Sequence, residues 1–364
     1  MNLSVFSDSY AQARQQFLDA CGQRGYPVQS HLHPLPGRDG EALALDVCRV
    51  GPATARNLLV VSSGCHGIEG FCGSAVQLDL LASDDWAASS ARPDLAVLYL
   101  HALNPYGFSW LRRVTHENVD LNRNFLDFSQ PPIANPGYAA IADLLLPEQW
   151  PPSRWNLLQL LWFAARKGRK TLQSAISSGQ QSHPDGLFFS GTEPTWSNRQ
   201  LRQVLREHAR QCQRIGWIDV HTGLGSQGVG ERIYKGAGSA EDLARAKAWW
   251  GPQVTNSFDG SSTSAHLRGT LDLAVMEECP QAQYNGLTLE YGTLPGPEVL
   301  QALRAEQWLQ RHPRTGAQQH AQIKQQIRRA FYVQTEPWQR QVLQQSREVC
   351  WQTLKGLSHA DLTP

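Results

Sequence analysis

The stretch Asn57–Gly70, NLLVVSSGCHGIEG, decides the fold. Its first part, as far as Ser63, is short and almost wholly apolar, which predicts a strand covered on both faces. A glycine-rich turn follows and carries His66 and Glu69. Apolar residues at helical spacing then run from about Cys72 to Ala82. The stretch therefore predicts a buried strand, a turn with polar side chains, and a helix.

The same alternation continues along the chain. Strands are expected at Ala42–Val50, Leu95–His101, Gly216–Val220 and Leu287–Glu290, and helices at Ser9–Gly25, 154–178, 197–213 and from Pro297 onward. Residues 129–152 indicate a loop or insertion, and the Gly- and Ser-rich stretch 225–270 indicates irregular structure. Strands alternating with helices predict an α/β fold with a mostly parallel or mixed sheet. Ligands bind beyond the carboxyl ends of strands in such sheets.

Composition excludes several classes of protein. The 364 residues hold 33 Lys plus Arg against 32 Asp plus Glu, and this balance argues against a nucleic-acid surface or a polybasic membrane anchor. The apolar stretch near 155–165 is too short and too polar to span a bilayer. Residues 1–8 have neither the basic nor the apolar region of a signal peptide. Seven cysteines without a CxxC pair favour reduced thiols, so a cytoplasmic location is expected.

Three residues near strand ends are candidate metal ligands. His66 follows a buried strand, Glu69 comes three residues later, and His221 follows a strand far away in the sequence. Two histidines and one carboxylate, with a fourth position left to water, form a catalytic zinc set. The simpler interpretation is a chance HxxE motif and hydrogen-bonded histidines at strand ends.

A polar segment follows the strand at Leu95–His101. It brings together Arg112, Arg113, Asp120, Asn122 and Arg123. Arginine forks bind carboxylates through paired hydrogen bonds, so the segment suits a substrate that carries a carboxylate. Asp120 could accept a hydrogen bond from the non-ligating nitrogen of a metal-bound histidine. A charged surface loop with internal ion pairs would have the same composition.

Glu290 closes the apolar run that begins at Leu287. A carboxylate at the end of a buried strand is costly unless it has a partner or a role. The functional interpretation is a general base that takes a proton from a metal-activated water and passes it to the leaving nitrogen. Asp219 lies two residues before His221 and is either a support for that histidine or the partner of an arginine.

Together these residues carry a family resemblance. The segments NPYGF, NVDLNRNF, DVHTGLG and LTLEYGT, with the HxxE motif before them, resemble the zinc carboxypeptidase superfamily over roughly residues 5–350. That superfamily includes carboxypeptidase A and the aspartoacylase and succinylglutamate desuccinylase branch. The local sequence is most similar to a bacterial branch of carboxypeptidase-like proteins of unknown function.

The resemblance implies a role for each matching residue. One zinc ion would be held by His66, Glu69 and His221, with Asp120 behind the first histidine. Glu290 would be the catalytic acid and base. One of Arg112 and Arg113, with Arg113 favoured, would polarise the scissile carbonyl. Substrate binding falls to Arg112, Asn122 and Arg123. The implied fold is a mixed, mostly eight-stranded twisted sheet between helices. We expect one catalytic domain over residues 1–364, with an insertion at about 129–200 and a helical extension from about 297.

The expected activity is zinc-dependent hydrolysis of an amide bond next to a free carboxylate. The substrate is a peptide C-terminus or, alternatively, an N-acyl amino acid, with no nucleic acid or membrane as partner. Two competing hypotheses are a nucleophilic Cys65 beside His66 and a non-catalytic, peptide-binding relative of the enzymes. The superfamily's substrate-loop tyrosine has no aligned counterpart, although Tyr234 and Tyr284 are candidates, and Arg268 is a further candidate for contacting an anionic substrate.

Overall fold

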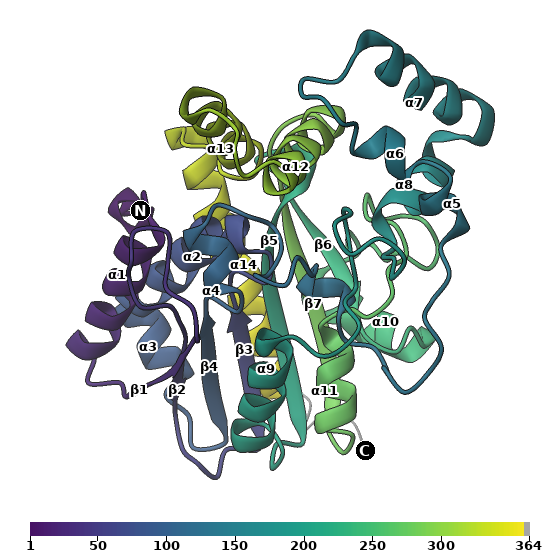
Figure 1. Cartoon of the computed structure of the whole chain (residues 1–364). Coiled ribbons are helices and arrows are strands. Elements are labelled where there is room, and N and C mark those ends of the chain that lie inside the picture. The colour runs from purple at the N-terminus through teal and green to yellow at the C-terminus, as the bar shows by residue number, and fades with distance from the viewer. Residues whose placement is uncertain (360–364) are drawn as a thin grey trace.

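A mixed seven-stranded sheet runs through the centre of the protein, in the order β1-β2-β4-β3-β5-β7-β6 (Figure 1). The computed structural model describes residues 1–359. The strands are β1 (Val28–Leu32), β2 (Ala44–Val50), β3 (Asn57–Ser62), β4 (Leu95–His101), β5 (Arg214–Gln227), β6 (Gly230–Lys235) and β7 (Gln283–Gly292).

The centre of the sheet is parallel and its two margins are antiparallel. Strands β4, β3, β5 and β7 pair in parallel, whereas β2 pairs antiparallel to β4, β1 to β2 and β6 to β7. The expected mixed α/β sheet is confirmed, but the implied count of eight strands is wrong. Beyond β6, a single bridge between Ile233 and Thr255 takes the place of a further strand within residues 1–359.

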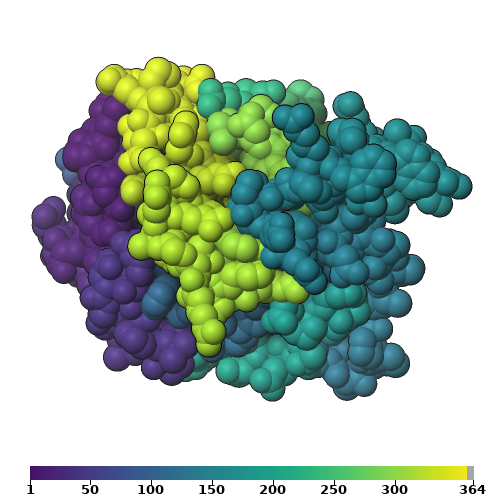
Figure 2. Space-filling view, turned by 45° about the horizontal axis from the view of Figure 1, so that its top comes forward, coloured from purple at the N-terminus to yellow at the C-terminus, as the bar shows by residue number. Residues whose placement is uncertain are grey.

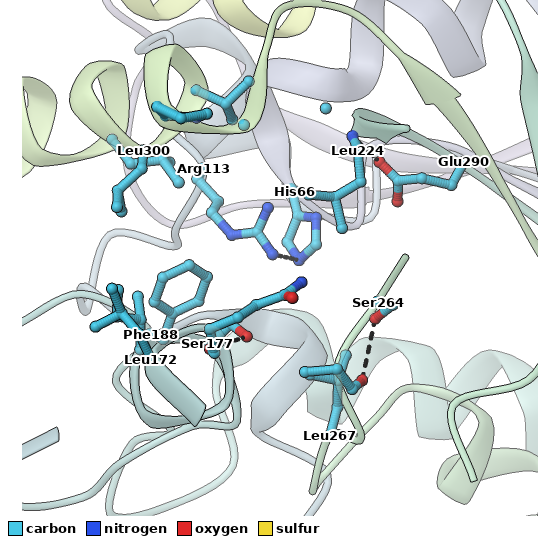
Figure 3. A pocket seen from close by; sticks show the side chains of 18 of the residues that line it. His66, Arg113, Leu172, Ser177, Phe188, Leu224, Ser264, Leu267, Glu290 and Leu300 are labelled. Atoms are coloured by element: carbon cyan, nitrogen blue, oxygen red, sulfur yellow. Dashed lines mark hydrogen bonds between the residues drawn. The ribbon is translucent and has the colours of Figure 1, made fainter. Parts of the chain in front are cut away.

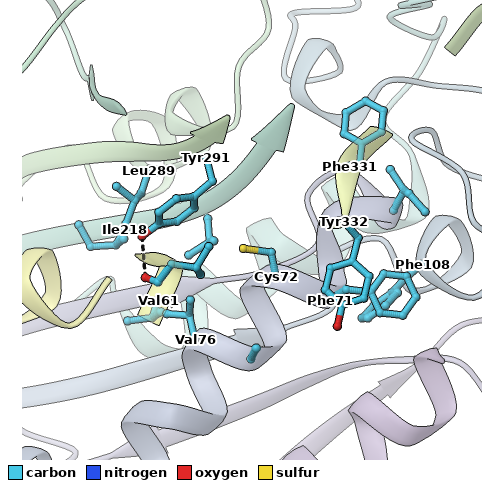
Figure 4. Packing of buried hydrophobic residues seen from close by; sticks show 14 of the residues in the cluster. Val61, Phe71, Cys72, Val76, Phe108, Ile218, Leu289, Tyr291, Phe331 and Tyr332 are labelled. Atoms are coloured by element: carbon cyan, nitrogen blue, oxygen red, sulfur yellow. Dashed lines mark hydrogen bonds between the residues drawn. The ribbon is translucent and has the colours of Figure 1, made fainter. Parts of the chain in front are cut away.

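Alternating side chains build a separate core on each face of the sheet. Leu59 and Val61 of β3 point into one core, and Leu58 and Val60 point into the other. The period of two residues in a strand fixes this division. The first core packs against α1, α2 and α14, and the second packs against α9 and α11. Figure 4 shows part of the first core, where Val61 lies near Val76 of α2.

The helices confirm most of the expected segments. The longer ones are α1 (Tyr10–Gln23), α2 (Gly70–Ala82), α3 (Asp84–Ser90), α7 (Arg154–Lys167), α8 (Arg169–Ser177), α9 (Trp196–His208), α10 (Ala240–Trp250), α11 (Asp272–Glu278), α12 (Gly296–Arg311), α13 (Ala317–Phe331) and α14 (Glu336–His359). Short helices are η1 (Leu3–Val5), η2 (Gly67–Glu69), α4 (Pro105–Ser109), η3 (Leu121–Arg123), α5 (Pro136–Ala139) and α6 (Ala142–Leu145). No helix within residues 1–359 combines the length and apolar character that a membrane crossing needs.

Some boundaries differ from the expectation. The single helix expected at 154–178 is broken at Gly168, whose φ of +90° suits glycine. The stretch 225–270 is not wholly irregular, because it contains β6 and α10. Strand β5 continues past Val220 to Gln227, although its regular pairing with β7 is interrupted after Thr222.

Helices α5 to α8 form a lobe at one side of the sheet (Figure 1). Figure 2 shows this lobe, in blue and teal, beside the yellow-green residues of α12 and α13. Arg304 of α12 joins the two parts: it donates hydrogen bonds to the carbonyls of Leu144 and Leu145 and to Asn156 of α7. Residues of α7 and α8 also line one cavity together with His66 and His221, so the lobe lies beside the carboxyl ends of β3 and β5.

Candidate active site

His66 and Glu69 are held together by a tight turn after β3. Residues 63–65 lead from the strand into η2, and Glu69 lies at the end of that helical turn. Gly67 makes this path possible, because a Cβ there would lie 2.0 Å from the carbonyl carbon of Gly107. Only glycine allows such a close approach of two backbones. The turn brings Nδ1 of His66 to 2.9 Å from Oε1 of Glu69.

His221 completes a buried cluster from the neighbouring strand. β3 and β5 pair in parallel, so their carboxyl ends lie side by side. Nδ1 of His221 lies 3.2 Å from Nδ1 of His66 and 3.0 Å from Oε2 of Glu69. One nitrogen or oxygen from each of the three residues lies within 4.8 Å of the others. Burial opposes the charge of Glu69, but the two imidazoles outweigh burial and lower the pKa of this carboxyl.

A carboxylate stands behind each imidazole. Nε2 of His221 lies 2.5 Å from Oδ2 of Asp219, and Nε2 of His66 lies 3.2 Å from Oδ1 of Asp120. Ser62 also donates to Asp219 and keeps that carboxylate in place. When Nε2–H of a ring donates to the carboxylate behind it, the Nδ1 lone pair of that ring can face the cluster. Asp219, which could have served an arginine, instead supports His221.

Arg113 and Arg112 point in different directions. Arg113 donates to Oδ2 of Asp120 and to Oε1 of Glu69, at 3.0 and 3.1 Å. It also donates to Nε2 of His66 at 2.8 Å (Figure 3). Arg112 instead forms a buried ion pair with Glu306 at 3.1 Å, so the structure does not bring it to the cluster. Adjacent residues in this irregular segment face opposite ways, and only Arg113 remains a candidate for contact with substrate.

Asn122 and Arg123 border the cluster on the side of the lobe. Nε and Nη1 of Arg123 donate to the carbonyls of Ser177 and Asn122. Oδ1 of Asn122 accepts from the backbone N–H of Leu271. Both side chains also line the large cavity into which the cluster opens, and their remaining N–H groups are suited to a carboxylate.

Glu290 lies on the strand next to His221. The two residues are direct partners in the parallel β5–β7 ladder. Oε1 of Glu290 accepts a hydrogen bond from the backbone N–H of Leu224 at 3.0 Å (Figure 3). Burial, and then the negative charge of Glu69, raise the pKa of Glu290 from 4.5 to about 7. A carboxylate with a pKa near neutrality is suited to general base catalysis.

The cluster fits a zinc ion. Two nitrogens bound at the usual zinc distance with tetrahedral geometry lie about 3.3 Å apart, and the two Nδ1 atoms are 3.2 Å apart. Without a cation, Nε2 of His66 accepts a hydrogen bond from Arg113, and Nδ1–H of the same ring donates to Glu69. If His66 and His221 held a cation through their Nδ1 atoms, Nε2–H of His66 would donate to Asp120, and that nitrogen could no longer accept from Arg113. The donor set leaves a fourth position for water or substrate.

Comparison with known families places the chain in one of them. The family described as "Protein of unknown function (DUF2817)" matches residues 6–345. The chain belongs to this family. No curated protein matches the sequence.

Solved structures similar to this DUF2817 protein carry names from both branches of the expected superfamily. One is carboxypeptidase A from Helicoverpa armigera, at 14% identity over 90% of this chain and 75% of that chain, with a TM-score of 0.45. Another is thrombin activatable fibrinolysis inhibitor, at 12% identity, 95% and 74% coverage and a TM-score of 0.49. A third is a succinylglutamate desuccinylase from Silicibacter, at 14% identity, 84% and 65% coverage and a TM-score of 0.40. The likeness is one of fold alone.

The cluster opens into a cavity of about 730 Å³ in this DUF2817 protein. His66, Arg113, Arg123, His221 and Glu290 line its polar part. Tyr234, Tyr284 and Arg268, the candidates from the sequence, are not among the lining residues. No tyrosine lines this cavity within the part of the chain that the structure describes.

Phe188 and Lys235 are among the lining residues that were not predicted from the sequence. Phe188 lies under both guanidiniums, with its ring centre 5.3 Å from Arg113 and 5.7 Å from Arg123. Its φ of +54° is unusual for a bulky side chain. Lys235 of β6 also lines the cavity, and burial lowers its pKa. Within residues 1–359 its ammonium has no hydrogen-bond partner. Neither residue belongs to a sequence motif.

Proposed function

We propose that this protein is a zinc-dependent hydrolase that cleaves an amide bond next to a free carboxylate, and that it acts as a carboxypeptidase on peptide C-termini. The observation that carries the proposal is the meeting of two Nδ1 atoms and the Glu69 carboxylate, each imidazole backed by a second carboxylate. Residues 1–364 would form one catalytic domain, with an insertion at about 129–200 and a helical extension from about 297. The buried free thiols support a cytoplasmic location.

His66, Glu69 and His221 would hold the single ion. When bound, zinc lowers the pKa of a coordinated water toward about 7 and withdraws electrons from a carbonyl oxygen. Glu290 would accept the proton of the attacking water at its carboxylate and deliver it to the leaving nitrogen. Burial raises its pKa in the metal-free protein, and a bound cation beside Glu69 would lower it again, so the ionised carboxylate could accept a proton near neutral pH.

The remaining polar residues would position the substrate. Arg113, released from His66, presents N–H donors toward the carbonyl oxygen, where negative charge develops in the transition state. Arg123 and Asn122 would bind the free carboxylate and fix the distance from it to the scissile bond. Arg112 has no such role in the proposal, because its guanidinium forms an ion pair with Glu306.

The geometry disfavours a cysteine nucleophile. Cys65 is completely buried and belongs to the core that packs on α9 and α11. Burial, and then the nearby Asp219, raise the pKa of its thiol well above the usual value. A thiol that stays protonated is a poor nucleophile. The second candidate function, deacylation of N-acyl amino acids, is favoured by the apolar part of the cavity.

The test uses purified protein with and without a chelator. We expect about one zinc per chain by elemental analysis, and hydrolysis of peptides with a free C-terminus that a chelator abolishes and zinc restores. Glu290→Gln should keep the metal and lose about 100- to 10,000-fold in kcat. Glu298→Gln, at an exposed position of α12, is the matched control and should keep full activity. Metal-free protein with undiminished turnover, or an active Glu290→Gln variant, would refute the proposal.

A further inference from the structure

The cavity has an apolar chamber beyond its polar part. Helix α7 contributes Leu157, Leu160, Leu161 and Ala164, which follow the i, i+3, i+4, i+7 spacing of one helical face. The chamber is completed by Leu172 and Ile176 of α8 and by Val299, Leu300 and Leu303 of α12. An apolar cavity left unfilled costs stability, because its lining loses packing contacts. A chamber of this kind is therefore suited to an apolar ligand.

The polar and apolar parts are arranged around Arg113. Figure 3 shows Phe188, Leu172 and Leu300 on one side of the Arg113 guanidinium, and Glu290 with Leu224 on the other side. The walls of the chamber are mainly aliphatic. The three helices add no polar side chain other than those of Gln173, Ser177, Gln301 and the basic residues Arg169 and Arg304. Leucine and isoleucine side chains without a tyrosine or tryptophan among them favour a flexible hydrocarbon chain.

We propose that the substrate carries a long aliphatic chain, which lies in this chamber between α7, α8 and α12 while its carboxylate faces Arg123. The proposal rests on the proposed hydrolase function and specifies its substrate class. The chain has two chemical sources: the fatty acyl group of an N-acyl amino acid, or an aliphatic side chain of the residue that is released. A cavity of about 730 Å³ is in the range that encloses a drug-sized ligand, which is larger than one amino-acid side chain.

Two substrate series separate these sources. The first series extends the acyl group of one N-acyl amino acid from acetyl to tetradecanoyl, and the second extends an aliphatic side chain in the C-terminal residue of a dipeptide. Burial of each methylene should raise kcat/KM about fourfold until the chamber is full. The series that shows this increase identifies the source, and no increase in either series overturns the proposal.

Matched variants on α7 test the position of the chain. Leu161 lines the chamber and Leu158 does not, although both are exposed on the same helix. Leu161→Gln should reduce the gain per methylene, whereas Leu158→Gln should leave it unchanged. Ala164→Phe fills part of the chamber and should shorten the chain length at which the increase stops. Equal effects of the two leucine variants would contradict this placement.

Binding measured by calorimetry on the Glu290→Gln protein keeps this inference separate from the proposed function. One outcome is that affinity for the variant rises with chain length while the wild type hydrolyses no amide. This outcome would support the chamber and refute the hydrolase. Hydrolysis of short substrates with no dependence on chain length would support the hydrolase and refute the chamber.

A different set of residues covers the outer face of α7. Trp155, Leu158 and Trp162 are 69%, 53% and 61% exposed and lie at i, i+3 and i+7. Around them, residues 149–184 contain five basic side chains and no acidic one. The basic residues, all exposed, are Arg154, Arg166, Lys167, Arg169 and Lys170. The net charge of +1 for the whole chain does not reveal that basic residues are concentrated in this segment.

We infer that this face docks on an anionic lipid surface. Trp and Leu on one face of a helix, with Arg and Lys beside them, are typical of helices that lie in the membrane interface. Charge complementarity decides the partner: in a twofold contact with a second copy, the same cations would meet each other. Helix α7 would thus present its outer face to lipid and its inner face to the chamber.

The test is sedimentation with vesicles. We expect binding to phosphatidylcholine vesicles that contain about 30% phosphatidylserine, weak binding to pure phosphatidylcholine, and release by salt. Trp162→Ser and Lys170→Glu should each weaken binding, while Leu161→Gln and the wild type should differ little. Absence of binding to anionic vesicles overturns the inference, as does a concentration-dependent dimer that Trp162→Ser abolishes.

Discussion

Replacing Glu290 by Gln should make the metal-free protein more stable at alkaline pH even though it removes activity. Burial and the charge of Glu69 raise the pKa of Glu290 from 4.5 to about 7. The difference of about 2.5 units, at 1.36 kcal/mol each, means that ionised Glu290 destabilises the folded protein by about 3 kcal/mol. Glutamine has nearly the same shape, keeps an oxygen for the N–H of Leu224, and carries no charge.

The sign of the pH dependence follows from the order of the two pKa values. Because the folded pKa lies above the unfolded one, the folded protein binds more protons between about pH 4.5 and about pH 7. The wild type therefore loses stability across this window as the pH rises, and the loss is complete above it. The advantage of Glu290→Gln should grow from about 1 kcal/mol at about pH 5 to about 3 kcal/mol at about pH 8.

Urea unfolding of chelator-treated protein at these two pH values measures the difference. Glu298→Gln should show no pH-dependent gain, since that residue is exposed on α12. With saturating zinc the gain should shrink, because a nearby cation stabilises the ionised carboxylate. Equal stability of wild type and Glu290→Gln at about pH 8 would show that Glu290 has an ordinary pKa, and the argument for a general base would lose its electrostatic support.

Three further substitutions separate the roles around the cluster. Asp219→Asn removes the carboxylate that accepts from Nε2–H of His221, and it should raise the zinc dissociation constant about 10- to 100-fold in a chelator competition. Unchanged zinc affinity would show that Asp219 does not support His221 as a ligand. Arg112→Gln should lower the free energy of unfolding by about 1–3 kcal/mol and leave kcat/KM intact, whereas a large loss of kcat/KM would return Arg112 to the substrate site. Arg123→Ala should cost about 10- to 100-fold in kcat/KM on free-carboxylate substrates and less on amidated ones, and an equal loss on both would indicate a structural role.

The fold could be predicted where strands are buried on both faces. β3 and β4 are continuous apolar runs, and their alternation with helices fixes a mixed α/β sheet. β1 escaped prediction because this edge strand exposes polar side chains, as Gln29 and Ser30 do, and forms no apolar run. β6 escaped prediction because the charged residues Glu231, Arg232 and Lys235 interrupt its apolar positions. Strand β6 was also obscured by glycines on either side of it.

The sequence predicted which residues come together at the site, but not the direction in which each side chain points. The parallel pairing of β3 with β5 explains why His66 and His221 meet, since carboxyl ends of parallel strands share one edge. That Arg113 turns inward while Arg112 turns to Glu306 depends on a partner almost two hundred residues away. Phe188 contributes through a positive φ, which local sequence does not encode for a phenylalanine.

Charge around the cluster gives a separate argument for a divalent ion. Two guanidiniums, of Arg113 and Arg123, face four buried carboxylates, which are Glu69, Asp120, Asp219 and Glu290. The ammonium of Lys235 is offset by the buried Asp272, so with neutral imidazoles the balance is 4 − 2 = 2 negative charges. Such a charge inside a protein must be offset by protons or by a cation. Burial disfavours a charged His221, yet Asp219 and Glu69 outweigh burial and raise its pKa, so the metal-free form takes up a proton there. A divalent ion offsets both charges and displaces that proton. Such an ion would also neutralise Glu69, whose charge helps to raise the pKa of Glu290. Glu290 would then be ionised at neutral pH and could accept a proton.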